Sequence, residues 1–292
     1  INNGTTWRTF DLPPSINTYE IAVLGATIYA GTQNGIYTMV DTIFTGRDWF
    51  PAAVENEYIR SITTIDSTVF AGIEEKGVMK SILYTRTCVK ANTGLDNLFV
   101  RKVVSKGSFL VAGTLGGLYV SRDKGEHWTT TNALLSSKSI LTLEWKGTLL
   151  FASASTGGLY RSSDSGSTWT QIYTGNPANP ISTLSATSTT LFAGSDNQIL
   201  RSMNNGDTWE IITIPSNPSA VYSIYARSEM VLASTAFDGI YKSTDNGTTW
   251  TQSNTGLTTK LVWTIVSNGQ AIFAGTVTGV FSSTDEGTTW HA

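Results

Sequence analysis

The sequence predicts an all-β protein, a seven-bladed β-propeller made of four-stranded antiparallel blades. Two sequence signals return along the 292 residues at intervals of about 40. Each interval contains four short segments rich in β-branched and aromatic residues, separated by turn residues. A repeat of this length with four strands is typical of a propeller blade, whereas solenoid repeats are shorter and α-helical repeats show a different periodicity.

The first signal is an apolar residue followed by Ala and then by Gly or Ser. Its alanines are spaced by 41, 41, 40, 41, 40 and 41 residues, so every unit has the same length and none carries a long insertion. Seven units are therefore expected. The seven copies are Tyr29-Ala30-Gly31, Phe70-Ala71-Gly72, Val111-Ala112-Gly113, Phe151-Ala152-Ser153, Phe192-Ala193-Gly194, Leu232-Ala233-Ser234 and Phe273-Ala274-Gly275.

The four strands of a unit can be placed between turn residues. In the third unit they are expected at residues 99–105, 109–114, 117–122 and 127–131, each a short apolar or alternating run bounded by Gly, Ser or Asp. No segment requires a helix. We expect residues 1–292 to form a single propeller domain.

The second signal is Ser-x-Asp-x-Gly-x-Thr-Trp, which falls between the third and fourth strands of a unit. The Asp side chain suits a turn because it accepts backbone hydrogen bonds, and Gly tolerates a positive φ. The Trp that follows is large enough to be buried between two blades, which makes it a packing residue. We expect these structural roles for Asp123, Asp164, Asp245 and Asp285, and for Trp128, Trp169, Trp209, Trp250 and Trp290.

Three units depart from this motif. The fifth unit has Asn204 in place of Asp, the first has a lengthened segment from Asp41 to Trp49, and the second lacks the motif between Ser81 and Val89. These departures predict irregular turns in the first two blades.

The chain ends suggest how the ring is closed. Residues 4–11 form an unpartnered strand, which we expect to pair with the third strand of the last unit, at residues 279–283, and so leave no long edge exposed. Trp7 and Trp290 occupy the same phase of the repeat. The sequence does not decide which of the two fills the regular position in the last blade.

With these motifs, the whole chain resembles the Asp-box family, also called BNR repeats, of the sialidase-like superfamily. The pattern is reproduced by Asp123, Gly125 and Trp128 and by the matching residues of three later units. The resemblance implies a structural motif on the face opposite the functional one. It occurs in sialidases, xyloglucan-cleaving enzymes, sorting receptors, a photosystem II assembly factor and secreted bacterial proteins, so it implies a fold and not an activity.

Composition excludes several classes of function. Charged residues make up 14% of the chain, the net charge is -3, and Lys and Arg are dispersed, which argues against nucleic acid. No apolar run is long enough to cross a membrane. The richness in Thr, Ser, Asn, Gly and Trp favours an extracellular or periplasmic protein, either monomeric or a module of a larger one. The single Cys88 is expected to be apolar filler.

Metals and cofactors are not expected. Each motif copy offers one carboxylate and lacks the later acidic ligand of a calcium loop. The two histidines, His127 and His291, both flank motif tryptophans in different units, which suits neither a transition-metal site nor a catalytic relay.

A variable ring of residues is the candidate ligand site. Eleven residues before each aligned alanine the units carry Tyr19, Arg60, Arg101, Leu141, Ser182, Tyr222 and Trp263. Two positions later every unit has Ile, Leu or Val, so only the earlier position is free of core packing. We predict that Tyr19, Arg60, Arg101, Tyr222 and Trp263 bind ligand, because aromatic faces stack on sugars or apolar groups and Arg holds carboxylates or phosphates.

The alternative for this ring is that its side chains close the channel, with Arg60 and Arg101 paired to acids such as Glu20 or Glu57. Both interpretations are open at this stage.

The resemblance also raises the question of catalysis. A sialidase needs three arginines, a tyrosine nucleophile and an aspartate; Arg60, Arg101 and Tyr222 supply part of this set, and the ring has no third arginine. The xyloglucan-cleaving relatives place their acids between two propellers, and this chain holds one. The sequence therefore favours a non-catalytic module that binds a protein or a glycan through the face opposite the motif turns, with a glycoside hydrolase as the alternative.

Overall fold

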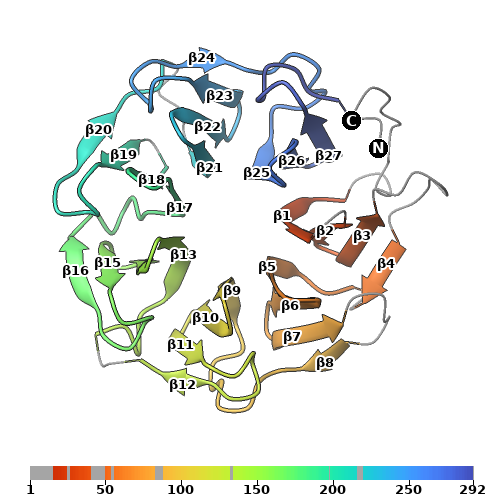
Figure 1. Cartoon of the computed structure of the whole chain (residues 1–292), viewed down its shortest axis with the longest axis vertical. Coiled ribbons are helices and arrows are strands. Elements are labelled where there is room, and N and C mark those ends of the chain that lie inside the picture. The colour runs from red at the N-terminus through yellow and green to blue at the C-terminus, as the bar shows by residue number, and fades with distance from the viewer. Residues whose placement is uncertain are drawn as a thin grey trace.

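The seven predicted blades are arranged radially around a central axis in the computed structural model (Figure 1). The structure describes residues 16–24, 27–40, 50–53, 56–82, 88–131, 134–196, 198–215 and 220–291. Six sheets have four strands in chain order, and the seventh has three, with antiparallel pairing throughout. The described residues contain no helix. The prediction of a seven-bladed all-β propeller is confirmed.

The strands follow one another from the innermost to the outermost position in each blade. Blade 1 contains β1 (Thr18–Leu24), β2 (Thr27–Thr32), β3 (Gly35–Val40) and β4 (Phe50–Ala53); blade 2, β5 (Ile59–Ile65), β6 (Thr68–Ile73), β7 (Gly77–Ile82) and β8 (Cys88–Lys90); blade 3, β9 (Val100–Lys106), β10 (Phe109–Thr114), β11 (Gly117–Ser121) and β12 (Thr129–Thr130); blade 4, β13 (Ile140–Lys146), β14 (Leu149–Ala154), β15 (Leu159–Ser162) and β16 (Thr170–Tyr173). Blade 5 contains β17 (Thr183–Ala186), β18 (Leu191–Gly194), β19 (Ile199–Ser202) and β20 (Glu210–Ile212); blade 6, β21 (Val221–Arg227), β22 (Met230–Thr235), β23 (Gly239–Ser243) and β24 (Thr251–Gln252); blade 7, β25 (Val262–Ser267), β26 (Ile272–Thr276) and β27 (Gly279–Ser283).

The small residue after each repeat alanine makes room for the next blade. A Cβ atom added to Gly72 would lie 2.7 Å from a methyl carbon of Val100, the first residue of the neighbouring inner strand β9. Gly113 stands in the same relation to Ile140 of β13, at 2.6 Å. The apolar-Ala-Gly signal therefore records the close approach of one blade to the next.

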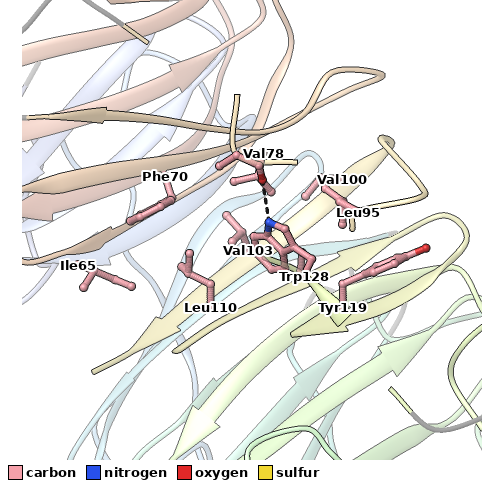
Figure 2. Packing of buried hydrophobic residues seen from close by; sticks show 11 residues of the cluster. Ile65, Phe70, Val78, Leu95, Val100, Val103, Leu110, Tyr119 and Trp128 are labelled. Carbon is pink, nitrogen blue, oxygen red and sulfur yellow. Dashed lines mark hydrogen bonds between the residues drawn. The ribbon is translucent and has the colours of Figure 1, made fainter. Parts of the chain in front are cut away.

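Four of the motif tryptophans contribute to the cores between blades. Trp128 is 3% exposed and packs against Phe70, Val78 and Leu95 of the preceding blade (Figure 2). Its indole N–H donates to the carbonyl of Ala91 over 2.7 Å. Trp169, Trp250 and Trp290 are also buried. Trp209 is an exception, because it is only half-buried, beside Tyr173.

A second structural signal, which the sequence analysis missed, is Asn-Thr-Gly-Leu at residues 92–95 and 254–257. The Asn254 side chain bridges Asp238 and Ile240 in the β22–β23 turn, and Asn92 does the same in blade 2. The Thr255 carbonyl then accepts from the backbone N–H of Trp290, and the Ser253 carbonyl accepts from its indole N–H. This segment fixes a motif tryptophan of the following blade.

Substitution of Gly256 by Ala is expected to lower the free energy of unfolding by about 2 kcal/mol. Gly256 has φ +91°, and a Cβ atom there would overlap the carbonyl oxygen of Trp290. Gly269 has φ +89° and open space around it, so Gly269→Ala isolates the backbone strain and should cost about 1 kcal/mol. Urea unfolding of both variants checks the difference, and equal losses would contradict the proposed steric role of Gly256.

In blade 7, a fourth strand position beside β27 is occupied by His291. Ser282 pairs with His291 through two backbone hydrogen bonds, as Lys242 pairs with Thr251 in blade 6. Trp290, 1% exposed, thus fills the regular motif position. The expected pairing of residues 4–11 with β27, together with Trp7, lies outside the described residues and stays a prediction.

Blades 7 and 1 are joined by their own apolar core. Ile21, Ile28 and Ala30 of blade 1 form one buried cluster with Ala271 and Phe273 of blade 7. The ring is therefore closed by packing between the first and last blades.

Candidate functional site

The predicted ring residues lie at the start of the inner strands, and six of them occupy β-bulges. In β5, Ile59 pairs with Ile73 and Ser61 pairs with Gly72. Arg60 between them therefore has no paired residue in the neighbouring strand β6. The same shift leaves Tyr19, Arg101, Leu141, Tyr222 and Trp263 unpaired in their strands. A bulge redirects the side chain of its extra residue, which explains why this position varies from blade to blade while its neighbours keep one residue type.

The residue before each bulge anchors the strand. Ile59, Val100 and Ile140 are fully buried, and each packs against the small residue of the preceding blade. The bulged residue that follows is thus held on a rigid backbone. We infer from the contacts below that these side chains gather at one mouth of the central channel.

Four aromatic rings from four blades form a continuous arc at this mouth. The Trp263 ring lies 4.7 Å from the Tyr222 ring and 5.9 Å from the Tyr19 ring, measured between centroids. Tyr19 in turn stacks on Tyr58 at 5.9 Å with an interplanar angle of 25°. We call Tyr222, Trp263, Tyr19 and Tyr58 the aromatic arc. Tyr58 is 45% exposed, and the other three rings are partly exposed.

The two arginines of the ring differ in their partners. The Arg60 guanidinium lies 5.6 Å from the centre of the Tyr19 ring and forms an ion pair with Glu74 at 2.6 Å. Arg101 is exposed and, among the described residues, forms neither an ion pair nor a hydrogen bond. Partial burial, followed by the charge of Arg60, lowers the pKa of Arg101, while Glu74 opposes this. The Arg101 guanidinium is therefore free to donate hydrogen bonds to an anionic group of a ligand.

The expected pairing of Arg60 and Arg101 with Glu20 or Glu57 was wrong. Glu57 pairs with Lys76, and Glu20 pairs with Lys102 at 2.8 Å. Glu74 takes their place because the β6–β7 turn brings it beside Arg60 on the same face.

The remaining ring positions differ from the aromatic arc. Leu141 is half-buried. The Ser182 hydroxyl donates to the carbonyls of Gly194 and Val221, so it connects blades 5 and 6. The structure thus brings Tyr19, Arg60, Tyr222 and Trp263 into contact, with Arg101 electrostatically coupled to Arg60.

Three charged residues of the inner strands act on one another, and the sequence analysis named only Glu20 among them, as a possible partner of the arginines. Lys102 of β9 reaches Glu20 of β1, although blade 2 separates their strands, so the two side chains meet in the space enclosed by the inner strands. The charges of Lys102 and Glu20 both act on the carboxyl group of Glu144 in β13. Burial, and secondarily the Glu20 charge, raise the pKa of Glu144 to about 8, against the opposing charge of Lys102.

The position after the ring residue could have revealed part of this set. It carries a hydroxyl in five blades, and the Ser61, Thr183 and Ser223 hydroxyls each bond to the backbone N–H of the next inner strand. Glu20 and Lys102 replace that hydroxyl in blades 1 and 3. The replacement of Ser or Thr by a charged residue at this position was the feature of the sequence that could have indicated Glu20 and Lys102.

The motif turns lie at the other end of the strands. The third strand of each blade runs in the same direction as the first, so the turn after it is opposite the mouth. In one such turn the Asp285 carboxylate accepts from the Thr288 and Thr289 backbone N–H groups and from two hydroxyls. Asn204 keeps most of this geometry through its Oδ1 atom. The motif side chains thus bond within their own turns.

Acid is expected to destabilise the propeller through these turns. Hydrogen bonds hold the pKa of Asp123, Asp164, Asp245 and Asp285 at about 2, below the ordinary value of 3.8. A depressed pKa in the folded state stabilises it above pH 3.8, and this contribution is lost as the pH falls to about 2. Circular dichroism against pH checks this, with Asp285→Asn, which copies the natural Asn204 turn, expected to weaken the dependence. An unchanged acid transition in that variant would contradict it.

The other features of the described residues provide no candidate site comparable to the mouth. A shallow depression of about 440 Å³ between blades 2 and 3 lies on the motif side, where Lys124 is already paired with Asp66.

Burial raises the pKa of the Cys88 thiol to about 11, so the thiol is unreactive at neutral pH. Within the part of the chain that the structure describes, no group of three or more His, Cys, Asp or Glu residues could hold a metal ion. That same part has no helix long and apolar enough to span a membrane.

Comparison with solved structures places the chain among seven-bladed propellers. It matches the extracellular domain of the putative one component system BT4673 from B. thetaiotaomicron (TM-score 0.75, 17% identity), covering 96% of this chain and 40% of that one. It matches the GH74 enzyme of Niastella koreensis (0.73, 17%), covering 97% and 54%. It also matches YCF48 bound to D1 peptide (0.71, 14%), covering 93% and 94%.

These similarities establish the fold alone, because the identities are low. The chain spans less than half of the BT4673 structure and about half of the GH74 enzyme. No family model and no curated protein matches the sequence.

Proposed function

We propose that this chain is a non-catalytic binding propeller of the Asp-box family, extracellular or periplasmic, which recognises a protein or a glycan through the channel mouth. The observation that carries the proposal is the aromatic arc beside the unpaired Arg101. Partly exposed rings on adjacent bulges offer flat faces to a sugar or an apolar side chain. The guanidinium of Arg101 supplies a planar fork for a carboxylate or phosphate.

The structural neighbours support binding as a use of this fold. YCF48 was solved with a peptide, and the BT4673 domain is extracellular. The GH74 neighbours support the alternative, a glycoside hydrolase.

The distribution of carboxylates favours binding over hydrolysis. Glycoside hydrolysis generally needs two carboxyl groups with different roles. Among the described residues at the mouth, Glu74 is held by Arg60, and Glu20 in the channel is held by Lys102. Glu144 is then the one unpaired acid on the described inner strands, so these strands supply no catalytic pair.

A glycan array and a peptide array probed with the full chain test the proposal. Replacing Trp263 by Ala should weaken binding of any confirmed ligand at least tenfold, because a central aromatic anchor is lost. Ile211→Ala removes a 65% exposed side chain from the outer strand β20 and serves as the matched control. Binding unaffected by Trp263→Ala, or release of sugar from array glycans, would overturn the proposal.

A further inference from the structure

An exposed phenyl ring lies on the mouth side of blade 6, in the turn between β22 and β23. Phe237 is 74% exposed, more than any other large apolar side chain of the described residues. The backbone N–H of the preceding Ala236 donates to the carbonyl of Ala220 over 3.0 Å. Because Ala220 directly precedes β21, the turn lies beside the start of the strand that carries Tyr222 of the aromatic arc.

The turn that carries Phe237 is held in place from both sides. The Asp238 N–H donates to the Thr235 hydroxyl over 3.2 Å, and the Asp238 carbonyl accepts from the Asn254 side chain over 2.7 Å. The Asn254 side chain also accepts from the N–H of Ile240 over 2.8 Å. A pre-formed turn loses little conformational entropy when a partner binds. The ring is therefore an exposed apolar group on a rigid support.

Apolar side chains continue around the mouth beyond the aromatic arc. Leu98, in the loop before β9, is exposed, and its carbonyl accepts from the N–H of Gly77 at the start of β7. Leu141 follows at the ring position of blade 4. The surface thus extends from Phe237 in blade 6 through blades 7, 1, 2 and 3 to blade 4 (Figure 1).

This surface suits a protein better than a glycan. A phenyl ring offers no hydrogen-bonding group to a sugar hydroxyl, and Phe237 is the most exposed ring of the set. Extended exposed apolar surfaces mark interaction sites, and the buried centre of a protein–protein interface is enriched in Tyr, Trp, Phe and Arg. We call Phe237, the aromatic arc, Arg101 and Leu98 the docking surface.

Arg101 is a cation of the docking surface without an ion-pair partner in the described part of the chain. The Ser61 hydroxyl and the backbone of Val103 bond to each other at 3.1 and 3.2 Å, so β5 and β9 are direct neighbours. Arg60 and Arg101 occupy the same bulge position in these two strands. Arg60 is paired with Glu74 at 2.6 Å. Arg101 is therefore the guanidinium that remains for a partner's acid.

The acids on this face leave Arg101 accessible. Glu75, in the β6–β7 turn, and Asp96, in the loop before β9, are exposed, and neither pairs with Arg101. Apolar residues lie on both sides of it, Leu98 before it along the chain and Leu141 on the next blade. An acidic group that reaches Arg101 is thus flanked by apolar contacts, which favours a side chain within a segment over the end of a chain.

We propose that the docking surface receives a segment of a protein partner that places apolar side chains on Phe237 and the aromatic arc, and the carboxylate of an internal Asp or Glu on Arg101. This rests on the proposed function and selects a protein over a glycan. The apolar contacts supply most of the affinity. The guanidinium–carboxylate pair fixes the register of the segment and excludes partners that carry a cation at this point.

Selection of a displayed library of random peptides on the full chain tests the proposal. Enriched peptides should share an Asp or Glu flanked by apolar residues. Arg101→Glu should instead enrich Lys or Arg at that position, because the charge it presents is reversed. Phe237→Ala should weaken the peptides selected on the unchanged chain roughly tenfold, through loss of an aromatic anchor. Enrichment of the same acidic peptides on Arg101→Glu, or no enrichment at all, would overturn the proposal.

Two variants outside the docking surface are the matched controls. Lys90→Glu reverses an exposed charge on the outer strand β8, and Met203→Ala removes a 67% exposed side chain from a motif turn on the opposite face. Neither should change which peptides are enriched or how tightly they bind. A library displayed with free C-termini is selected in parallel. Binders from that library alone would assign the carboxylate to a chain end and overturn the internal acid.

The Trp263→Ala variant separates this inference from the proposed function. Peptides weakened by Trp263→Ala but bound equally well by Arg101→Glu would overturn the inference and leave the proposed function intact. Glycans that depend on Trp263, with no enriched peptide, would do the same. Binding that survives Trp263→Ala would refute the proposed function and, with it, the inference.

Discussion

Replacing Glu144 with Gln is expected to raise the thermal midpoint at pH 8.5 by about 5 °C. The pKa of Glu144 rises from 4.5 to about 8 on folding. A raised carboxyl pKa means that the folded state binds the proton more tightly, so stability falls as the pH rises from 4.5 to about 8. Solvent in the channel moderates the loss to about 3 kcal/mol, which corresponds to several degrees for a chain of this size.

Gln keeps the shape of Glu144 and carries no charge, so the variant should also show a flatter dependence of the thermal midpoint on pH. Scanning calorimetry between pH 5 and 9 measures both effects, with Glu229→Gln as an exposed control. A gain of the same size at pH 5 would contradict the electrostatic explanation, because Glu144 is protonated there in the folded protein.

Replacing Trp290 with Ala is expected to cost about 3–5 kcal/mol of unfolding free energy. Trp290 is among the largest fully buried side chains and packs with Leu232, Ile265 and Phe281 between blades 6 and 7. Its indole N–H bonds to the carbonyl of Ser253, which would lose that donor. A cavity and an unpaired carbonyl then act together.

Trp209 provides the matched control, because it occupies the same motif position in blade 5, is half-buried and has no hydrogen-bond partner for its indole nitrogen. Trp209→Ala should cost less than half as much in urea unfolding. Equal losses for the two variants would show that burial at the motif position does not determine stability.

The fold could be predicted because its two signals record local steric needs that recur along the chain. The small residue at Gly72 or Gly113 admits the next inner strand, and the Asp of the motif satisfies a turn wherever it occurs. The irregular copies between residues 41 and 49 and between 83 and 87 lie outside the described residues, so the prediction of irregular turns there stays untested.

The site was predictable only in part. Alignment located the ring because bulged positions are free of core packing, yet it did not reveal the bulges themselves, which depend on pairing between strands. Partners of Arg60 and Lys102 were not predictable, because they depend on turn geometry and on contacts across the channel between residues 82 positions apart. Glu144 was missed for the same reason, since nothing in β13 alone indicates its surroundings.

Hydrogen–deuterium exchange of the full chain, with and without the tightest array ligand, tests most directly whether the channel mouth is the binding surface. Ligand should slow exchange at the starts of the inner strands, around Tyr19, Arg60, Arg101, Tyr222 and Trp263, and leave the turns that contain Asp123, Asp164, Asp245 and Asp285 unchanged. Slowed exchange at those turns, with none at the inner strands, would place the ligand on the opposite face and contradict the account.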